Sequence, residues 1–150
     1  MNMTKKRMNL LEQWIIGALL LIIALFVAVF LLLNAATKPF ENTKKAAIVL
    51  AEQKGNLVKP QGYDIATTDT TNYAVTGLDS NDQEIGVLIP KDSGTLTIVK
   101  LADGVKPATL QEKNTENITL AMYKGNPAWE VNNSDGYKVY DFKTGKLLQG

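Results

Sequence analysis

The chain of 150 residues contains no cysteine and no histidine. The lack of cysteine excludes a disulfide framework, a thiolate metal site and a cysteine nucleophile. The lack of histidine removes the most common general base and metal ligand, and it excludes catalytic triads built on histidine. We therefore expect no metal, no cofactor and no enzymatic activity.

Other sequence motifs of enzymes are missing as well. No serine lies in a G-x-S-x-G or S-x-x-K sequence, and no glycine-rich phosphate loop occurs. The acidic stretch 79–84 resembles a calcium loop, but Glu84 stands at the sixth position in place of glycine, and Pro90 stands at the twelfth in place of glutamate. A solvated hairpin turn is the better interpretation.

The charge of the chain is almost balanced. The chain contains sixteen basic and fifteen acidic residues, which give a net charge of +1. A near-neutral surface offers no electrostatic footprint for nucleic acid, so that we expect no nucleic-acid partner.

Three carboxylates near the C-terminus, Glu130, Asp135 and Asp141, leave an envelope glycan hydrolase open as the least favoured alternative. Glu130 lies between Trp129 and Val131 in a predicted strand, where neighbouring side chains point to opposite faces. We therefore predict that Trp129 and Val131 belong to the core and that Glu130 is exposed.

One long apolar run is present. Residues 14–33, WIIGALLLIIALFVAVFLLL, contain no charge, and at about 1.5 Å per residue a helix of this length crosses the ~30 Å core of a bilayer. Cleaved signal peptides have shorter apolar regions, followed by a small-x-small cleavage site, whereas Leu33-Asn34-Ala35 has leucine where a small residue is needed. We predict an uncleaved transmembrane anchor, which includes Trp14, Ile15, Leu20, Phe26, Phe30 and Leu33.

The residues ahead of this run predict its orientation. Lys5, Lys6 and Arg7 precede it with Glu12 as the single acidic residue, so the positive-inside rule places residues 1–13 in the cytoplasm. The rest of the chain is then extracellular. A small outer domain without disulfides is consistent with a Gram-positive membrane surface.

Beyond the anchor we predict a first unit over residues 34–104. Residues 34–38 are expected to be a polar joint, and Pro39 suits the first turn of a new amphipathic helix that ends near Gly55. A meander of alternating strands follows, with strands predicted at 63–67, 73–78, 84–89 and 95–101.

The order then repeats over residues 105–150, with a short helix at 107–113 and strands at 118–123, 128–131 and 136–142. A turn at 143–145 leads into Leu147 and Leu148. The hairpins echo each other, since Y-A-V before D-S-N-D corresponds to W-E-V before N-N-S-D-G. We predict an α+β fold of two tandem units, each a helix packed on an antiparallel sheet.

The second unit carries a distinctive pattern: W-E-V, followed by Y-x-x-Y-D-F-x-T-G-K. Its residues are Trp129, Glu130, Val131, Tyr137, Tyr140, Asp141, Phe142, Thr144, Gly145 and Lys146. This pattern resembles the TseB/YpmB-like family of Firmicutes. The resemblance implies a single anchor and two cystatin-like or PepSY-like units, with the second helix shorter here than in the family.

The resemblance also implies a function. It indicates a regulator of cell-wall elongation that binds a class B penicillin-binding protein at the outer membrane face and modulates its transpeptidase, with no catalytic residues of its own. The expected partners are thus the membrane and a penicillin-binding protein.

A competence-type pseudopilin is the alternative. Lys5, Lys6 and Arg7, followed by Glu12 and an apolar helix, are similar to a prepilin leader. The glycine that precedes the cleavage site in such leaders is missing. Pro39 is also expected to interrupt the long helix that a pseudopilin needs.

Overall fold

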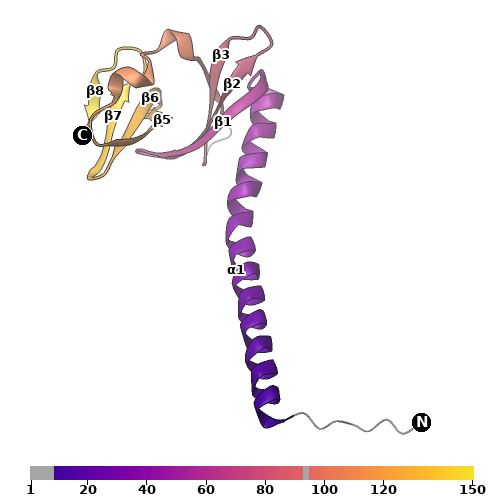
Figure 1. Ribbon diagram of the computed structural model, residues 1–150. Helices are drawn as coiled ribbons and strands as arrows, with labels where there is room; N and C mark the ends of the chain where they lie inside the picture. Colours follow the sequence, from indigo (N-terminus) through magenta and orange to yellow (C-terminus); the bar gives the residue numbers. More distant parts are fainter. Residues whose placement is uncertain (1–8, 93–94) are drawn as a thin grey trace. The chain divides into compact units, whose positions relative to one another are not determined.

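The computed structural model describes residues 9–92 and 95–150, apart from the side chain of Thr37 (Figure 1). Within these ranges the chain forms one α-helix, eight strands and two short 3-10 helices. Its contacts divide it into two compact units, which adjoin in the sequence between Asn42 and Thr43.

Helix α1 (Leu10–Lys54) carries the predicted anchor in the part that belongs to the N-terminal unit. Its large apolar side chains are exposed, including Trp14, Ile15, Leu20, Phe26, Phe30 and Leu33. The helix is long and apolar enough to span a membrane. The orientation residues Lys5, Lys6 and Arg7 lie outside the described residues, so the orientation stays a prediction.

The predicted joint after the anchor is wrong. Residues 34–38 are helical, and Pro39 lies inside α1 instead of beginning a new helix. Proline lacks the N–H that would bond to the carbonyl four residues earlier, which disturbs one turn. Ala35, Ala36 and Lys38 are good helix formers, and the helix continues on both sides of that turn.

The C-terminal unit begins with the last turns of α1, which cover one face of a four-stranded antiparallel sheet. The strands follow chain order: β1 (Leu57–Thr67), β2 (Thr71–Asp79), β3 (Glu84–Pro90) and β4 (Thr97–Lys100). Ala47 and Ala51 of the helix are buried with Val75 and Val87 of the sheet. Their small side chains allow the helix to lie close to the strands.

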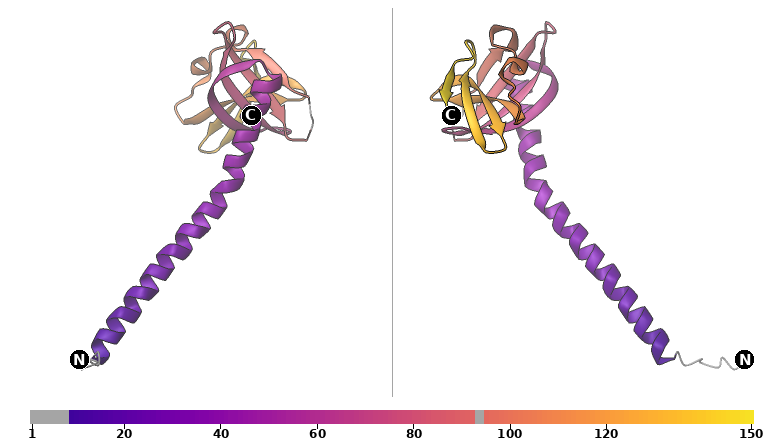
Figure 2. Two further views of the ribbon diagram at one scale, coloured as in Figure 1. Left: turned by 90° about the vertical axis from the view of Figure 1, so that its right-hand side faces the viewer. Right: turned by 60° about the vertical axis from the view of Figure 1, so that its left-hand side comes forward.

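A second four-stranded antiparallel sheet follows, also in chain order: β5 (Thr115–Tyr123), β6 (Asn126–Asn133), β7 (Gly136–Asp141) and β8 (Leu147–Gln149). Its strands are drawn in orange and yellow in Figure 2. The prediction of two successive meanders is confirmed. The matched hairpins, β2–β3 and β6–β7, take the second and third places in their sheets.

The connection between the sheets differs from the prediction. It holds two 3-10 helices, η1 (Leu101–Asp103) and η2 (Pro107–Leu110), where a short helix was expected over 107–113. Asn114 and Thr115, which follow, are poor helix formers. No α-helix of the described residues therefore belongs to the second sheet.

The two sheets share a core instead. Leu120 and Trp129 of the second sheet are buried together with Ala74 and Leu88 of the first. Gly86 permits this close approach, because a Cβ at that position would overlap Cδ2 of Leu120. The first sheet is thus covered by α1 on one face and by the second sheet on the other.

Candidate functional site

The apolar residues of the C-terminal pattern are buried, and Trp129 and Phe142 belong to the core that the two sheets share. Trp129 and Phe142 are 4% and 3% exposed, and Val131 is fully buried. The rings of Trp129 and Phe142 lie 5.7 Å apart with planes tilted by 33°. Nε1 of Trp129 is buried and has no hydrogen-bond partner among the described residues. These side chains hold the sheets together and do not form an exposed aromatic surface.

Glu130 is buried, so the prediction that it is exposed is wrong. The residue is 5% exposed, and its carboxylate accepts a hydrogen bond from the backbone N–H of Thr67 at 2.9 Å and another from Nδ2 of Asn132 at 2.9 Å. Alternation correctly placed Glu130 opposite Trp129. That face is also buried, as its neighbours Thr119, Ala121, Ala128 and Val139 show.

The hairpin between β1 and β2 holds the edge of the second sheet. Asn72 Oδ1 accepts the N–H of Met122 at 2.7 Å, and the hydroxyl of Thr68 donates to the Met122 carbonyl. Asp69 Oδ2 accepts the N–H of Lys124 at 2.9 Å. We call these contacts, together with the bond from Thr67 to Glu130, the hairpin clasp. Sequence reasoning missed Asn72 and Asp69, because nothing in a strand-turn-strand sequence indicates a partner about fifty residues away.

Asp141, Thr144, Gly145 and Lys146 form the turn between β7 and β8. Oδ1 of Asp141 accepts the N–H of Thr144 at 2.7 Å, its hydroxyl at 2.7 Å, and the N–H of Lys143 at 3.1 Å. The hydrogen bonds from Thr144 hold the pKa of Asp141 below its ordinary value. Gly145 adopts a φ of +68°, which favours glycine.

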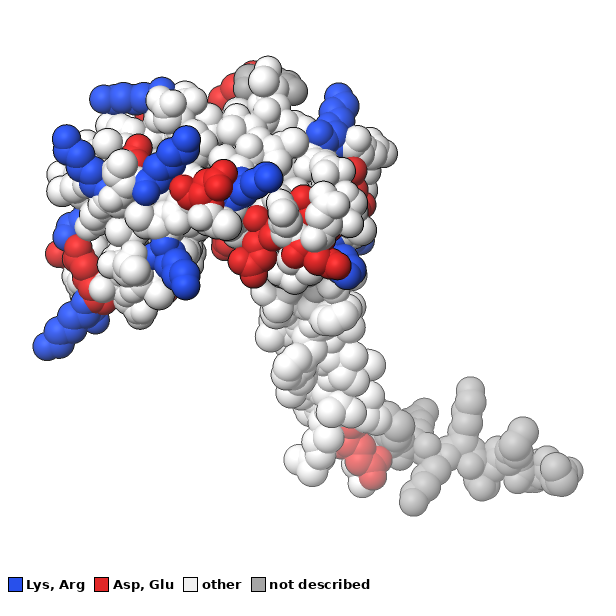
Figure 3. Space-filling model, turned by 90° about the horizontal axis from the view of Figure 1, so that it is seen from above, with Lys and Arg blue, Asp and Glu red and all other residues white. Residues whose placement is uncertain are grey.

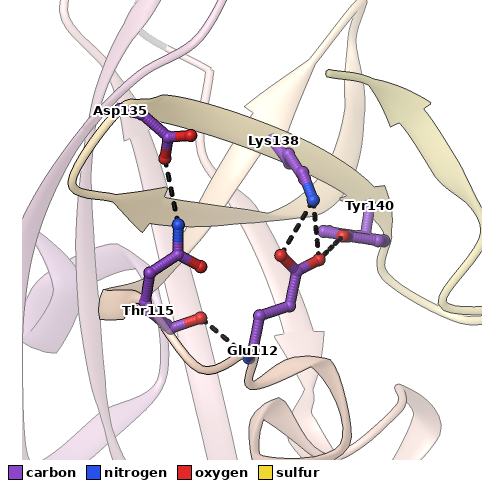
Figure 4. Close-up of polar contacts among 6 residues, drawn as sticks. Glu112, Thr115, Asp135, Lys138 and Tyr140 are labelled. Carbon is purple, nitrogen blue, oxygen red and sulfur yellow. Dashed lines mark hydrogen bonds and ion pairs between the residues drawn. The ribbon is translucent and has the colours of Figure 1, made fainter.

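A polar cluster connects the loop after η2 to β7 (Figure 4). Nζ of Lys138 lies 2.8 Å from both carboxylate oxygens of Glu112, and the hydroxyl of Tyr140 donates to Oε1 at 3.0 Å. The hydrogen bond from Lys138, followed by that from Tyr140, lowers the pKa of Glu112. Sequence reasoning also missed Glu112, which belongs to no recognisable motif.

Each carboxylate considered for hydrolysis is bound to the chain itself. Glu130 and Asp141 accept backbone N–H groups, and Oδ1 of Asp135 accepts Nδ2 of Asn114 at 3.0 Å. Among the described residues no group of three or more acidic side chains could hold a metal ion. These carboxylates serve as anchors for turns and loops.

The open edge of the first sheet borders a groove. This groove has a volume of about 520 Å³ and is lined by all four residues of β4, Thr97–Lys100. The opposite wall comes from the second sheet and includes Asn126, Pro127 and Phe142. Because four successive strand residues line it, the groove follows the edge of β4 rather than one of its faces.

The surface carries charges of both signs. Lysines and acidic side chains share the face displayed in Figure 3. Within the groove, Lys100 and Lys143 are exposed, and neither belongs to an ion pair of the described residues. The β4 groove is therefore an accessible hollow that combines apolar walls, charged side chains of both signs and an open strand edge.

These observations define a class of protein: a long apolar helix joined to an α+β domain of two antiparallel meanders. The chain is similar in structure to the YpmB protein from Bacillus subtilis, with a TM-score of 0.61 at 20% sequence identity, over 70% of this chain and 93% of that chain. No family model matches the chain, and no curated protein sequence matches it. The chain thus has a YpmB-like fold, which is consistent with the resemblance of its C-terminal pattern.

We expect Glu130→Gln to lower the free energy of unfolding by about 1–3 kcal/mol, because an amide has one acceptor oxygen for the two donors of Thr67 and Asn132. Urea unfolding of the full chain in detergent, followed by near-UV circular dichroism, measures the change. Glu116→Gln, at an exposed position of β5, is the matched control and should have almost no effect. Equal stability of the two variants would contradict the role of Glu130 in the hairpin clasp.

The Glu112 cluster predicts a pH dependence of stability. The folded-state pKa of Glu112 is lower than its unfolded value, so its stabilising contribution is complete above about pH 4.3 and is lost as the pH falls through the folded pKa. The pKa of Asp141 is lowered as well, so its contribution to stability is also lost at acidic pH. Unfolding midpoints measured between about pH 2 and pH 6 should fall less steeply for Glu112→Gln than for the unaltered chain. If the midpoints of Glu112→Gln fall as steeply with pH as those of the unaltered chain, the cluster does not contribute to the pH dependence of stability.

Proposed function

We propose that the chain is a single-pass membrane-anchored regulator of peptidoglycan synthesis, which binds a class B penicillin-binding protein at the outer face of the membrane and modulates it during cell-wall elongation. One observation carries the proposal: a YpmB-like fold lies in the same chain as a helix long and apolar enough to span a membrane. The TseB/YpmB-like pattern of residues 129–146 supports it.

The proposed mechanism is local. A membrane anchor confines the domain near another anchored protein and raises the effective concentration of each for the other. A weak interface then suffices for regulation, and its occupancy can change quickly. The domain needs an accessible surface but no catalytic group.

The use of the carboxylates also supports a binding role. Glu130 and Asp141 hold backbone amides of the chain in defined turns and loops. A general acid in a glycosidase must instead reach the substrate, with a second carboxylate across the scissile bond. The glycan hydrolase therefore remains the least favoured alternative.

Crosslinking in growing cells tests this proposal. The full-length chain is crosslinked, captured from a detergent extract and analysed by mass spectrometry, with a chain of residues 1–37 as the control for contacts of the anchor. We expect a class B penicillin-binding protein to be enriched over that control. If wall-synthesis proteins are captured equally by both chains, the domain is not the regulator proposed here.

One observation favours the second candidate, a pseudopilin. The argument that Pro39 interrupts the long helix no longer holds, because α1 is continuous over 45 residues. The predicted cleavage region lies outside the described residues, so the mature N-terminus decides between the two functions. We expect an intact N-terminus by mass spectrometry of the protein from cells, whereas loss of the basic leader ahead of Leu10 would indicate a pseudopilin.

A further inference from the structure

Each sheet of the C-terminal unit has two outer strands, and an outer strand offers unpaired N–H and C=O groups to an incoming chain. The outer strands are β1 and β4 in the first sheet and β5 and β8 in the second. Three of these four edges carry features that hinder the addition of a strand.

The β1 edge is irregular. It contains Pro60, which cannot donate a hydrogen bond, and its pairing with β2 shifts register twice, between Leu57 and Lys59 and between Pro60 and Gly62. Proline and bulges are the usual means by which proteins block an outer strand.

The two edges of the second sheet are also unsuitable. The hairpin clasp occupies the end of β5, where Asn72 binds the N–H of Met122 and Asp69 binds that of Lys124. Strand β8 has only three residues, and its pairing with β7 shifts register between Val139 and Tyr140.

The β4 edge is also short, but it has neither a proline nor a register shift, and no bond of the hairpin clasp occupies it. Its four residues pair with β3 in regular register, from Ile85 opposite Lys100 to Leu88 opposite Thr97, and they include no proline. In an antiparallel pair every second residue directs its N–H and C=O away from the partner strand. On β4 those groups face the β4 groove.

The side chains of the groove indicate what could enter it. Ile98 is 47% exposed, although it is a large apolar residue, and Phe142 contributes to the opposite wall. Lys100 and Lys143 provide positive charge, and Asp103 and Asp141 provide negative charge. The Asp141 carboxylate is hydrogen-bonded within its own turn and interacts electrostatically with Lys143, so Lys100 is the lysine most available to a partner.

We propose that the β4 groove binds an extended segment of a partner protein, which adds to the first sheet as a fifth strand. The segment has apolar side chains for the walls and an acidic side chain for Lys100. Main-chain hydrogen bonds supply the binding and the alternate side chains supply the specificity, as in other cases of strand addition.

The short length of β4 suits a membrane-anchored protein. Four strand residues allow few main-chain hydrogen bonds, so a free segment binds weakly. Tethering of both proteins to one membrane compensates for this by raising their effective concentration. The inference rests on the proposed function only for the identity of the partner, since the surface itself can be tested with purified protein.

The probe is a blocked heptapeptide of alternating valine and threonine, with aspartate at each end. It is added to the isotope-labelled full-length chain in detergent micelles, and amide chemical shifts are followed by NMR. We expect concentration-dependent shifts in residues 97–100. The same peptide with N-methylated valines should not bind, because it cannot donate main-chain hydrogen bonds, and a peptide with lysine at both ends should bind several-fold more weakly.

The test variant is Ile98→Lys, which places a charge on the open edge. Its matched control is Ile65→Lys in β1, where the replaced side chain is 42% exposed and the edge is irregular. We expect Ile98→Lys to weaken peptide binding about tenfold or more and Ile65→Lys to change it less than about twofold. Unfolding midpoints of both variants show whether each remains folded.

Several results would overturn the proposal: no shifts in β4 at millimolar peptide, equal binding of the N-methylated peptide, or equal effects of the two lysine variants.

The crosslinking experiment separates this proposal from the proposed function. If the peptide binds at β4 but the full chain captures no penicillin-binding protein, the surface stands and the function fails. If Ile98→Lys captures that protein as well as the unaltered chain does, the β4 groove is not the interface.

Discussion

The first sheet is buried on both faces, and the rest of the C-terminal unit depends on this constraint. In β3 five successive residues, from Ile85 to Ile89, are buried. One face needs the small alanines of α1 and the other needs Leu120 and Trp129 of the second sheet. The hairpin clasp then fixes the second sheet at the position where it covers the first.

The residues that carry the family resemblance belong to this framework. Trp129 and Phe142 fill the shared core, Glu130 holds the end of β1, and Asp141 with Gly145 shapes the last turn. The pattern thus describes how the second sheet is built and attached. A surface for a partner therefore has to include residues outside the pattern. In the β4 groove Asp141 and Phe142 of the pattern line one wall, whereas the residues of β4 on the other wall have no distinctive sequence signal.

Local sequence rules predicted the strands well and the contacts between distant segments poorly. Alternation and turn residues predicted seven of the eight strands of the described residues, all except the short β8, and the apolar run predicted the anchor helix. The rule for Pro39 failed because it describes one turn, whereas the neighbouring residues keep the helix continuous.

Alternation gave the side of the sheet on which Glu130 lies, but it could not show that β1 reaches that side, because Thr67 is 63 residues away. The near-continuous apolar run of β3 was the available signal that both faces of the first sheet are covered.

The shared core has a consequence for how the two meanders can exist. Although each looks like a repeat of the other, the face of Ala74 and Leu88 is covered by the second sheet, and the face of Leu120 and Trp129 is covered by the first. A chain divided within the connection 101–114 would leave each half with an uncovered apolar face, which favours aggregation over folding. The two meanders therefore complete one core within a single compact unit, and the duplication is one of pattern and not of separate cores.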